Sequence, residues 1–315
     1  MKYSFVIPCY RSEHTIESVV EELIAEIRRE DLEEYEIILV NDCSPDHVWS
    51  VIIQLAKQYP FVHGISLARN FGQHAALMAG YAKTTGDIVV SLDDDGQAPI
   101  DELYKLLSEL ERDKDVVYAY YREIKQNWFR RFGSAVAAEM SKILLGAPKD
   151  LKGSSFYVAR RFVIDEMLSY DNAYPYLIGL VLRVTRKIGC VETEHRKRAE
   201  GTSGYTFRKL FSLWLNGFTA FSVKPLEIGA WVGFLFAVAG FLGSIITIVR
   251  KLCHPEIAAG WSSTISILLL IGGAVMLMLG LIGEYVGRIY ICINKAPQYV
   301  VREDTYTVEE GEMVK

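Results

Sequence analysis

The sequence predicts an α/β fold: a mostly parallel sheet with helices on both faces, followed by a membrane-associated C-terminal part. Over residues 1 to about 120, short β-branched apolar runs alternate with amphipathic stretches, as in parallel strands joined by crossover helices. Further along, residues 228–249 and 262–283 contain no Asp, Glu, Lys or Arg. Each run is long enough to cross a hydrocarbon core of about 30 Å as a helix. A wholly soluble enzyme and a disordered chain are both excluded on this basis.

The elements of the first part follow in order from these patterns. The expected strands are Tyr3–Pro8, Tyr35–Asn41, Val62–Leu67, Asp87–Leu92 and Val116–Tyr120. The helical patterns between them lie near residues 14–29, 47–59, 72–84 and 100–112. In such sheets, ligands bind beyond the carboxyl ends of the strands. Those ends carry the polar stretches Pro8–Tyr10, Asn41–Ser44, Ala68–Asn70 and Asp93–Gln97.

The second part is predicted to approach and cross the membrane. Residues 126–146 form a helical pattern that ends at Gly146 and Pro148. Residues 206–222 combine a basic start with aromatics, which suits a helix in the membrane interface, although an amphipathic core helix has a similar pattern. The two apolar runs are bordered by Trp and charged residues, and the short loop 250–261 makes them a hairpin.

Charge on either side of the hairpin predicts its orientation. The loop between the spans has two basic residues, Arg250 and Lys251. The flanking segments have Arg208, Lys209, Lys224, Arg288, Lys295 and Arg302. The positive-inside rule places both flanks in the cytoplasm. We therefore expect a multi-pass protein of the inner (plasma) membrane with a cytoplasmic catalytic domain, residues 1–205. An interfacial helix (206–225), two spans (226–285) and a cytoplasmic tail (286–315) follow, the tail being loose from Asp304 onward.

Composition excludes several other classes. The net charge of −5 and the lack of a long basic tract argue against a nucleic-acid binder. The five cysteines form no CxxC pair, so a disulfide framework or structural zinc is not expected. P-loop, dinucleotide and serine-hydrolase motifs are absent from the sequence. The N-terminus lacks the apolar region of a signal peptide, which agrees with a cytosolic domain.

The sharpest chemical signal is Asp93-x-Asp95 at a predicted strand end. Two carboxylates at this spacing can hold one hard divalent cation, which then bridges the phosphates of a nucleotide, although a solvated turn is the alternative. Asp42 follows another strand and either meets a ribose or base edge or belongs to a turn. Arg69 either meets a phosphate or caps a helix, and His74 is expected to pack or cap rather than catalyse.

A second, basic set lies between the sheet and the predicted spans. A membrane-borne anion is a reasonable ligand for it, and a solvated face is the alternative. Its members are Arg122, Arg130, Arg131, Arg196, Lys197 and Arg198.

Together these motifs resemble the family 2 glycosyltransferases of GT-A fold, in their polyprenyl-phosphate branch. The resemblance rests on residues 5–10, 38–44 and 92–97, and further on Asn70–His74, Asn127–Arg130 and Gly283–Tyr290. It implies a sugar transferase that uses Mg²⁺ or Mn²⁺, with a nucleotide-sugar donor, UDP-linked by preference, and undecaprenyl phosphate as acceptor. Some relatives also imply a homotetramer.

The resemblance implies roles for individual residues. A metal on the donor diphosphate would be held by Asp93, Asp95 and Gln97. The nucleoside pocket would be lined by Pro8, Tyr10, Glu13 and Asp42. Phosphate groups of the lipid or donor would be met by Arg122, Arg130, Ser134 and Arg198.

Three positions depart from the family pattern. Cys43 stands where the family commonly has glycine, and Gly204 stands where many relatives have lysine. Near Ser154 and Ser155 many relatives carry an acidic residue, so a catalytic base cannot be transferred to this chain. We therefore expect inversion without a protein base, with both serines dispensable. The alternatives are a processive polysaccharide synthase, whose Gln-x-x-Arg-Trp motif is absent from the sequence, and a non-catalytic membrane adaptor.

Overall fold

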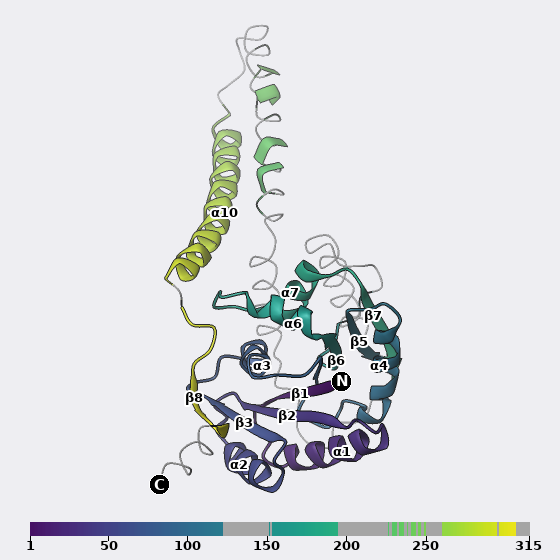
Figure 1. Ribbon diagram of the computed structural model, residues 1–315. Helices are drawn as coiled ribbons and strands as arrows, with labels where there is room; N and C mark the ends of the chain where they lie inside the picture. Colours follow the sequence, from purple (N-terminus) through teal and green to yellow (C-terminus); the bar gives the residue numbers. More distant parts are fainter. Residues whose placement is uncertain are drawn as a thin grey trace. The chain divides into compact units, whose positions relative to one another are not determined.

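The computed structural model describes residues 1–121, 151, 153–194, 260–294 and 296–306, together with single positions between 226 and 249 (Figure 1). The chain divides into two compact units. One comprises residues 1–211 with 295–315, and the other comprises residues 212–294. Each unit is described by itself below.

An eight-stranded sheet forms the centre of the first unit, in the order β7-β5-β6-β4-β1-β2-β3-β8. The strands are β1 (Lys2–Cys9), β2 (Glu34–Asn41), β3 (Val62–Leu67), β4 (Ile88–Ser91), β5 (Val116–Tyr121), β6 (Tyr157–Arg160), β7 (Ile188–Thr193) and β8 (Val301–Asp304). Only β6 and β8 run antiparallel to their neighbours. The other six therefore point in one direction, and their carboxyl ends meet at one edge.

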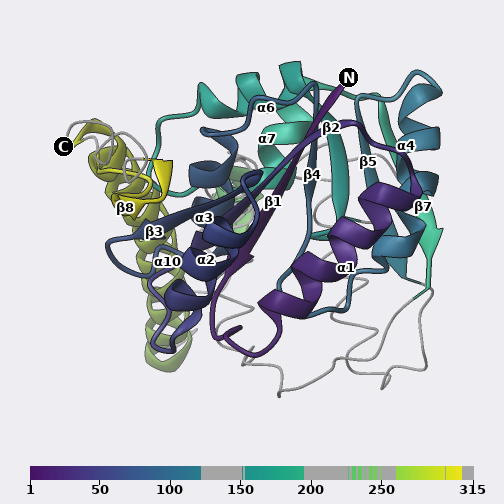
Figure 2. The same ribbon diagram turned by 60° about the horizontal axis from the view of Figure 1, so that its bottom comes forward.

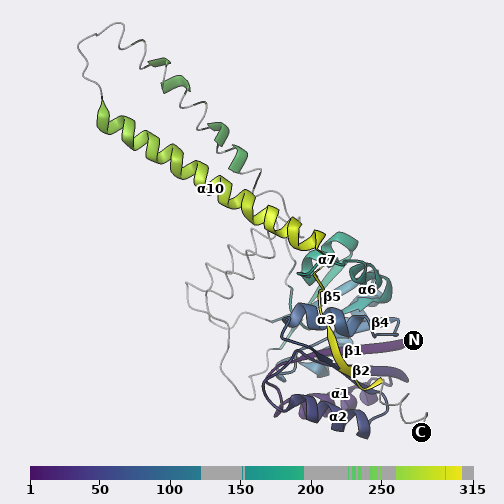
Figure 3. The same cartoon turned by 90° about the vertical axis from the view of Figure 1, so that its left-hand side faces the viewer.

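Helices cover both faces of this sheet. They are α1 (Ile16–Arg29), α2 (Val48–Gln58), α3 (Gln73–Tyr81), the 3₁₀ turn η1 (Ile100–Glu102), α4 (Leu103–Glu111), α6 (Arg161–Leu168) and α7 (Leu177–Val184). Figure 2 shows α1, α2 and α4 in front of the strands, and Figure 3 shows α3, α6 and α7 on the opposite side. Apolar side chains of α1, α2 and α4 form one core cluster with one face of the strands. This three-layer arrangement confirms the predicted mostly parallel α/β fold.

All five expected strands and all four expected helical patterns are present, with ends that differ by a few residues. Between residues 150 and 200, where the sequence pattern predicts no particular element, the structure has β6, α6, α7 and β7. The antiparallel β6 enters the sheet between β4 and β5. The helices expected at 126–146 and 206–222 lie outside the described residues.

The expectation of a loose tail from Asp304 is wrong for the described residues. Residues 301–304 form β8, which pairs antiparallel with β3 and is the outermost strand on that side of the sheet. The amide of Gly64 donates to Thr305 Oγ1 at 2.9 Å, and the ring of Tyr306 stacks on His63 with centroids 4.4 Å apart. Residues 301–306 are thus packed against the sheet of the first unit.

The second unit contains the long helix α10 (Trp261–Ile293). It begins where the second span was expected but continues to Ile293, ten residues beyond the expected end at residue 283. At about 1.5 Å per residue, its 33 residues exceed the thickness of a hydrocarbon core. Leu270–Ile293 is the one helical segment among the described residues that is long and apolar enough to cross a membrane. Every described position from 226 to 249 is also helical.

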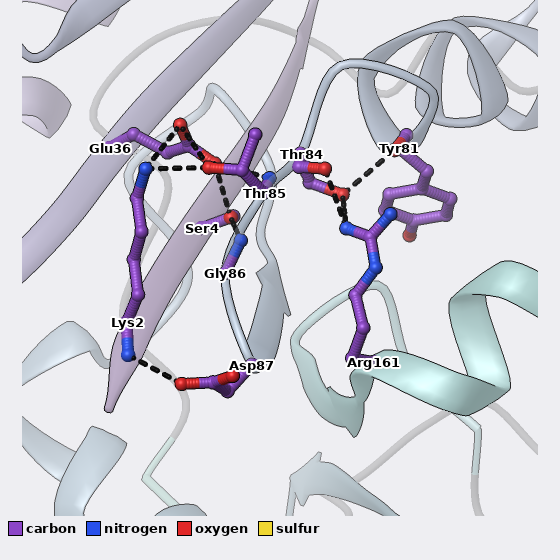
Figure 4. A network of polar contacts seen from close by, with 9 residues as sticks. All are labelled: Lys2, Ser4, Glu36, Tyr81, Thr84, Thr85, Gly86, Asp87 and Arg161. Carbon is purple, nitrogen blue, oxygen red and sulfur yellow. Dashed lines mark hydrogen bonds and ion pairs between the residues drawn. The ribbon is translucent and has the colours of Figure 1, made fainter.

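At the amino ends of β1, β2 and β4, a network of polar contacts surrounds the carboxylate of Glu36 (Figure 4). Ser4 Oγ donates to Glu36 Oε1 at 2.6 Å, the Thr85 amide donates to the same oxygen at 2.6 Å, and Lys2 Nζ lies 3.3 Å from Oε2. Burial by itself would raise the pKa of Glu36, but these hydrogen bonds outweigh it and the pKa is lowered. The network therefore stabilises the ionised carboxylate.

We predict that Glu36→Ala destabilises the protein, because buried donors lose their acceptor. The expected loss is about 1.5–3 kcal/mol of unfolding free energy, the range of one hydrogen bond to a charged group. Since the folded-state pKa is lowered, the loss should be complete above the ordinary carboxyl pKa of 4.5 and should shrink as the pH falls through the folded value. Urea unfolding of the full chain in detergent measures both effects.

The matched control is Glu34→Ala, because Glu34 is an exposed carboxylate on the same strand. Its unfolding free energy should change by less than about 0.5 kcal/mol. Equal losses in the two variants, or a gap that widens on acidification, would contradict a stabilising role for the network.

Candidate active site

Among the described residues, five loops meet at the carboxyl ends of the parallel strands. Four of them follow β1, β2, β3 and β4, and the fifth precedes β6, which runs in the opposite direction. Hydrogen bonds join neighbouring loops: the Arg11 amide donates to Ser44 Oγ at 2.7 Å, and the Tyr10 amide donates to Asp94 Oδ2 at 2.9 Å. The predicted polar residues are therefore brought together on a cross-linked set of loops.

The acidic segment after β4 is the centre of this edge. Asp93 Oδ1 accepts a hydrogen bond from Gln73 Nε2 at 2.7 Å, and Asp93 Oδ2 accepts one from the Ser155 hydroxyl. Asp95 Oδ1 accepts the Gln97 amide at 3.1 Å. Gly96, between Asp95 and Gln97, has a φ of 71°, which lets the chain turn tightly there without strain.

Burial, and to a smaller extent the neighbouring carboxylates, disfavours ionisation of Asp93 and Asp94. Burial raises the pKa of Asp93 to about 6, with Asp95 and Asp94 adding to the rise, while hydrogen bonds from Ser155 and Gln73 oppose it. Burial also raises the pKa of Asp94. The site therefore carries concentrated negative charge, which a bound cation would relieve.

This donor set fits a hard divalent cation. Carboxylate oxygens are the ligands that Mg²⁺ and Mn²⁺ prefer, and each Asp93 oxygen keeps one lone pair beyond its single hydrogen bond. The described residues contain no group of three or more His, Cys, Asp or Glu side chains arranged for a metal. Asp93 and Asp95 would therefore act as a pair, with phosphate and water oxygens as the remaining ligands. For Gln97, the structure gives a hydrogen bond through its backbone amide.

Asp42, expected to line the nucleoside pocket, receives two backbone amides within the protein. The residue is 3% exposed, and its carboxylate accepts hydrogen bonds from the amides of Phe71 at 2.7 Å and Gly72 at 2.8 Å. Burial raises the pKa of Asp42 and these two bonds oppose the rise. Gly72 has a φ of 91° and precedes the first residue of α3. Asp42 thus holds the loop that leads into Gln73.

The other residues expected around the nucleoside lie on the β1 side of the edge. Pro8 is buried within β1, and the Tyr10 side chain is exposed at 44%. Glu13 Oε2 accepts the amide of His47, the residue before α2, at 2.8 Å. Tyr10 is thus placed to face a ligand, whereas part of the Glu13 carboxylate is used inside the protein.

Arg69 and His74 flank the loop before α3. The Arg69 guanidinium lies 4.5 Å from the centroid of the Phe71 ring and Arg69 is exposed, which leaves it accessible to an anion. The Leu177 amide donates to His74 Nδ1 at 3.4 Å, and the His74 ring stacks on Tyr176. Burial lowers the pKa of His74, a contact with the Pro175 carbonyl opposes the shift, and the net effect favours the neutral ring. His74 therefore packs and caps α7, as the sequence predicted.

Two contributors were missed by sequence reasoning. Gln73 and Ser155 are the side-chain donors to Asp93, and they lie 20 and 62 positions away from it in the chain. The contact between Ser155 and Asp93 could be predicted from the strand register, but only if the pairing of β6 with β4 were already known. Four predicted residues, Arg122, Arg130, Ser134 and Arg198, lie outside the described residues.

Comparison with known proteins identifies relatives along nearly the whole chain. The model of the family described as glycosyl transferase family 2 matches residues 4–168, and the GtrB C-terminal hairpin model matches residues 224–289. Undecaprenyl-phosphate 4-deoxy-4-formamido-L-arabinose transferase of Proteus mirabilis is 34% identical, over 96% of this chain and 93% of the relative. The protein with the same name in Photorhabdus laumondii is 32% identical, over 96% and 94%.

A solved structure supports the fold. Glucosyl-3-phosphoglycerate synthase from Mycobacterium tuberculosis, in complex with Mn²⁺, UDP-glucose and phosphoglyceric acid, superposes with a TM-score of 0.51 at 21% identity. The match covers 68% of this chain and 76% of that one. At this identity the likeness concerns the fold of the catalytic unit.

We predict that Asp42→Asn loosens the loop before α3. An asparagine side chain has a single acceptor oxygen, so one of the two amides, Phe71 or Gly72, would lose its partner. The expected cost is about 1–3 kcal/mol of unfolding free energy without nucleotide present. Asp31→Asn, in an exposed turn, is the matched control. Unchanged stability combined with weakened UDP binding would instead indicate that Asp42 serves the nucleoside only.

Proposed function

The chain belongs to glycosyl transferase family 2, and from this premise we propose that it transfers a sugar from a nucleotide diphosphate donor to undecaprenyl phosphate. The proposed acceptor is supported by the similarity to undecaprenyl-phosphate 4-deoxy-4-formamido-L-arabinose transferase. That similarity extends over 96% of the chain and includes the hairpin region. Exposed apolar side chains along α10 agree with work at a lipid surface. The product would be a polyprenyl-phosphate sugar used in cell-envelope glycan modification.

The carboxyl edge of the sheet is suited to holding the donor. Asp93 and Asp95 would bind Mg²⁺ or Mn²⁺, with Gln97 beside them, and Arg69 is exposed for a phosphate. When bound, the cation offsets negative charge that develops on the departing nucleoside diphosphate. Tyr10 offers an exposed aromatic ring, and Pro8, Glu13 and Asp42 shape the loops around it. UDP is the proposed nucleotide.

The acceptor needs little activation from the protein. A phosphate monoester is already anionic near neutral pH, since its second pKa is about 6. Its oxygen can therefore attack once it is positioned opposite the leaving group. We assign that positioning to Arg122, Arg130 and Arg198, with Ser134, because guanidinium groups make charge-assisted hydrogen bonds to phosphate. One in-line displacement inverts the anomeric carbon.

Transfer of radiolabelled sugar into extractable lipid tests this proposal. Full-length protein with undecaprenyl phosphate, Mn²⁺ and a panel of UDP-sugars should give a labelled lipid whose anomeric configuration is inverted. EDTA should abolish transfer and Mn²⁺ should restore it, and Asp95→Asn should lower the rate by orders of magnitude because a metal ligand is lost. Glu34→Gln, an exposed carboxylate on β2, controls for charge. Full transfer in EDTA, or retention of configuration, would contradict the mechanism.

A second experiment tests the proposed topology, in which only the loop 250–261 faces outward. In a chain whose native cysteines are replaced by serine, Ser262→Cys should react with an impermeant thiol reagent in intact cells. Ser203→Cys should react only after the cells are opened. The reverse pattern would move the active site to the other side of the membrane.

A further inference from the structure

The Asp93 carboxylate is held by two neutral side chains from different parts of the fold. Gln73 Nε2 donates to Oδ1 at 2.7 Å from the first residue of α3, and the Ser155 hydroxyl donates to Oδ2 from the segment before β6. Neither donor belongs to the acidic motif. Each carboxylate oxygen therefore has one assigned partner and one remaining lone pair.

We infer that Gln73 and Ser155 are positioning residues that orient Asp93 for a divalent cation. This inference rests on the proposed function, because it assigns the cation to Asp93. An aspartate carboxylate turns readily about its last side-chain bond, where rotamers are broad. Two donors on opposite oxygens fix the plane of the group and direct its free lone pairs. Outer-shell partners of this kind orient metal-ligating carboxylates in general.

The sheet itself places Ser155. β4 and β6 are antiparallel, with Ser91 opposite Tyr157 and Val90 opposite Val158. Continuing that register by two residues puts Asp93 opposite Ser155, so their side chains leave the same face at the distance of a cross-strand pair. The next residue, Phe156, is 1% exposed and its carbonyl accepts the Ala119 amide at 2.9 Å. Ser155 therefore lies two residues before β6, next to a buried residue whose carbonyl is hydrogen-bonded to β5.

Gln73 is placed by a different device. The Gly72 and Phe71 amides are bound to the buried Asp42 carboxylate, which fixes the chain immediately before α3. The helix then begins at Gln73, on the loop side of β3. The two donors thus reach Asp93 from independent supports, and neither depends on the other for its position.

The neighbouring Ser154 provides an internal contrast. Its hydroxyl donates to the Phe156 carbonyl at 2.9 Å, a local bond that does not involve the acidic segment. We therefore expect Ser154 alone to be dispensable, in place of both serines. Ser155 contributes by orienting a metal ligand, a role that requires a hydroxyl and no proton transfer.

Binding of Mn²⁺ to the full-length protein in detergent, measured by electron paramagnetic resonance of the free ion with UDP present, tests the inference. Loss of one outer-shell partner typically weakens metal affinity 10- to 100-fold. Ser155→Ala and Gln73→Ala should each raise the dissociation constant for Mn²⁺ by about tenfold or more. Ser155→Thr, which keeps the hydroxyl, should recover most of the affinity, and Ser154→Ala should match the wild type.

Kinetics give a second readout. Saturating Mn²⁺ should restore most of the transfer rate in Ser155→Ala but not in Asp95→Asn, because only the latter lacks a ligand. Wild-type Mn²⁺ affinity in a folded Ser155→Ala protein, beside metal-dependent transfer by the wild type, would overturn the positioning role alone. Weakened affinity in the variant, with no sugar transfer by the wild type, would support positioning and overturn the proposed function.

Discussion

The acids that follow β2 and β4 are the constraint on which the carboxyl ends of the strands depend: Asp42 is buried, and Asp93 and Asp94 are partly buried. A carboxylate removed from water must receive hydrogen bonds, and at this edge other loops supply them. Asp42 takes two backbone amides from the loop before α3, and Asp94 takes the Tyr10 amide from the loop after β1. The acids therefore join loops that are distant in sequence, and a disturbance of one loop is transmitted to its neighbours.

Local pattern predicts the elements of this fold but not the contacts between them. Alternating apolar runs identify β1 to β5 because each run needs only its own residues to be recognised. Ser155 meets Asp93 through the β4–β6 register, which depends on residues more than 60 positions apart. β8 was missed for a related reason: Val301–Asp304 is exposed and charged, and it becomes a strand only through the partner β3 offers.

Cys43 illustrates how a single residue can carry a backbone cost that its side chain does not reveal. Its φ is 50°, in the left-handed region where a non-glycine residue costs about 1–2 kcal/mol. The family that the sequence resembles commonly has glycine at this position. Cysteine in its place adds backbone strain that the small size of its side chain does not suggest. The position follows directly on Asp42, and strain of this kind persists only where surrounding contacts enforce it. The Ser44 amide donates to Asn41 Oδ1 at 2.9 Å, and this bond closes the turn that contains Cys43.

Acidic side chains at the two ends of the parallel strands differ in how their charge is balanced. At the amino edge, Glu36 faces Lys2 and hydroxyl groups, and its pKa is lowered, so the charge is balanced within the protein. At the carboxyl ends of the strands, burial raises the pKa of Asp93 to about 6, and Asp95 and Asp94 add to the rise, while its hydrogen-bond donors Ser155 and Gln73 are neutral. The first arrangement stabilises the fold without a ligand. The second leaves negative charge at the carboxyl ends of the strands, which the proposed cation would balance.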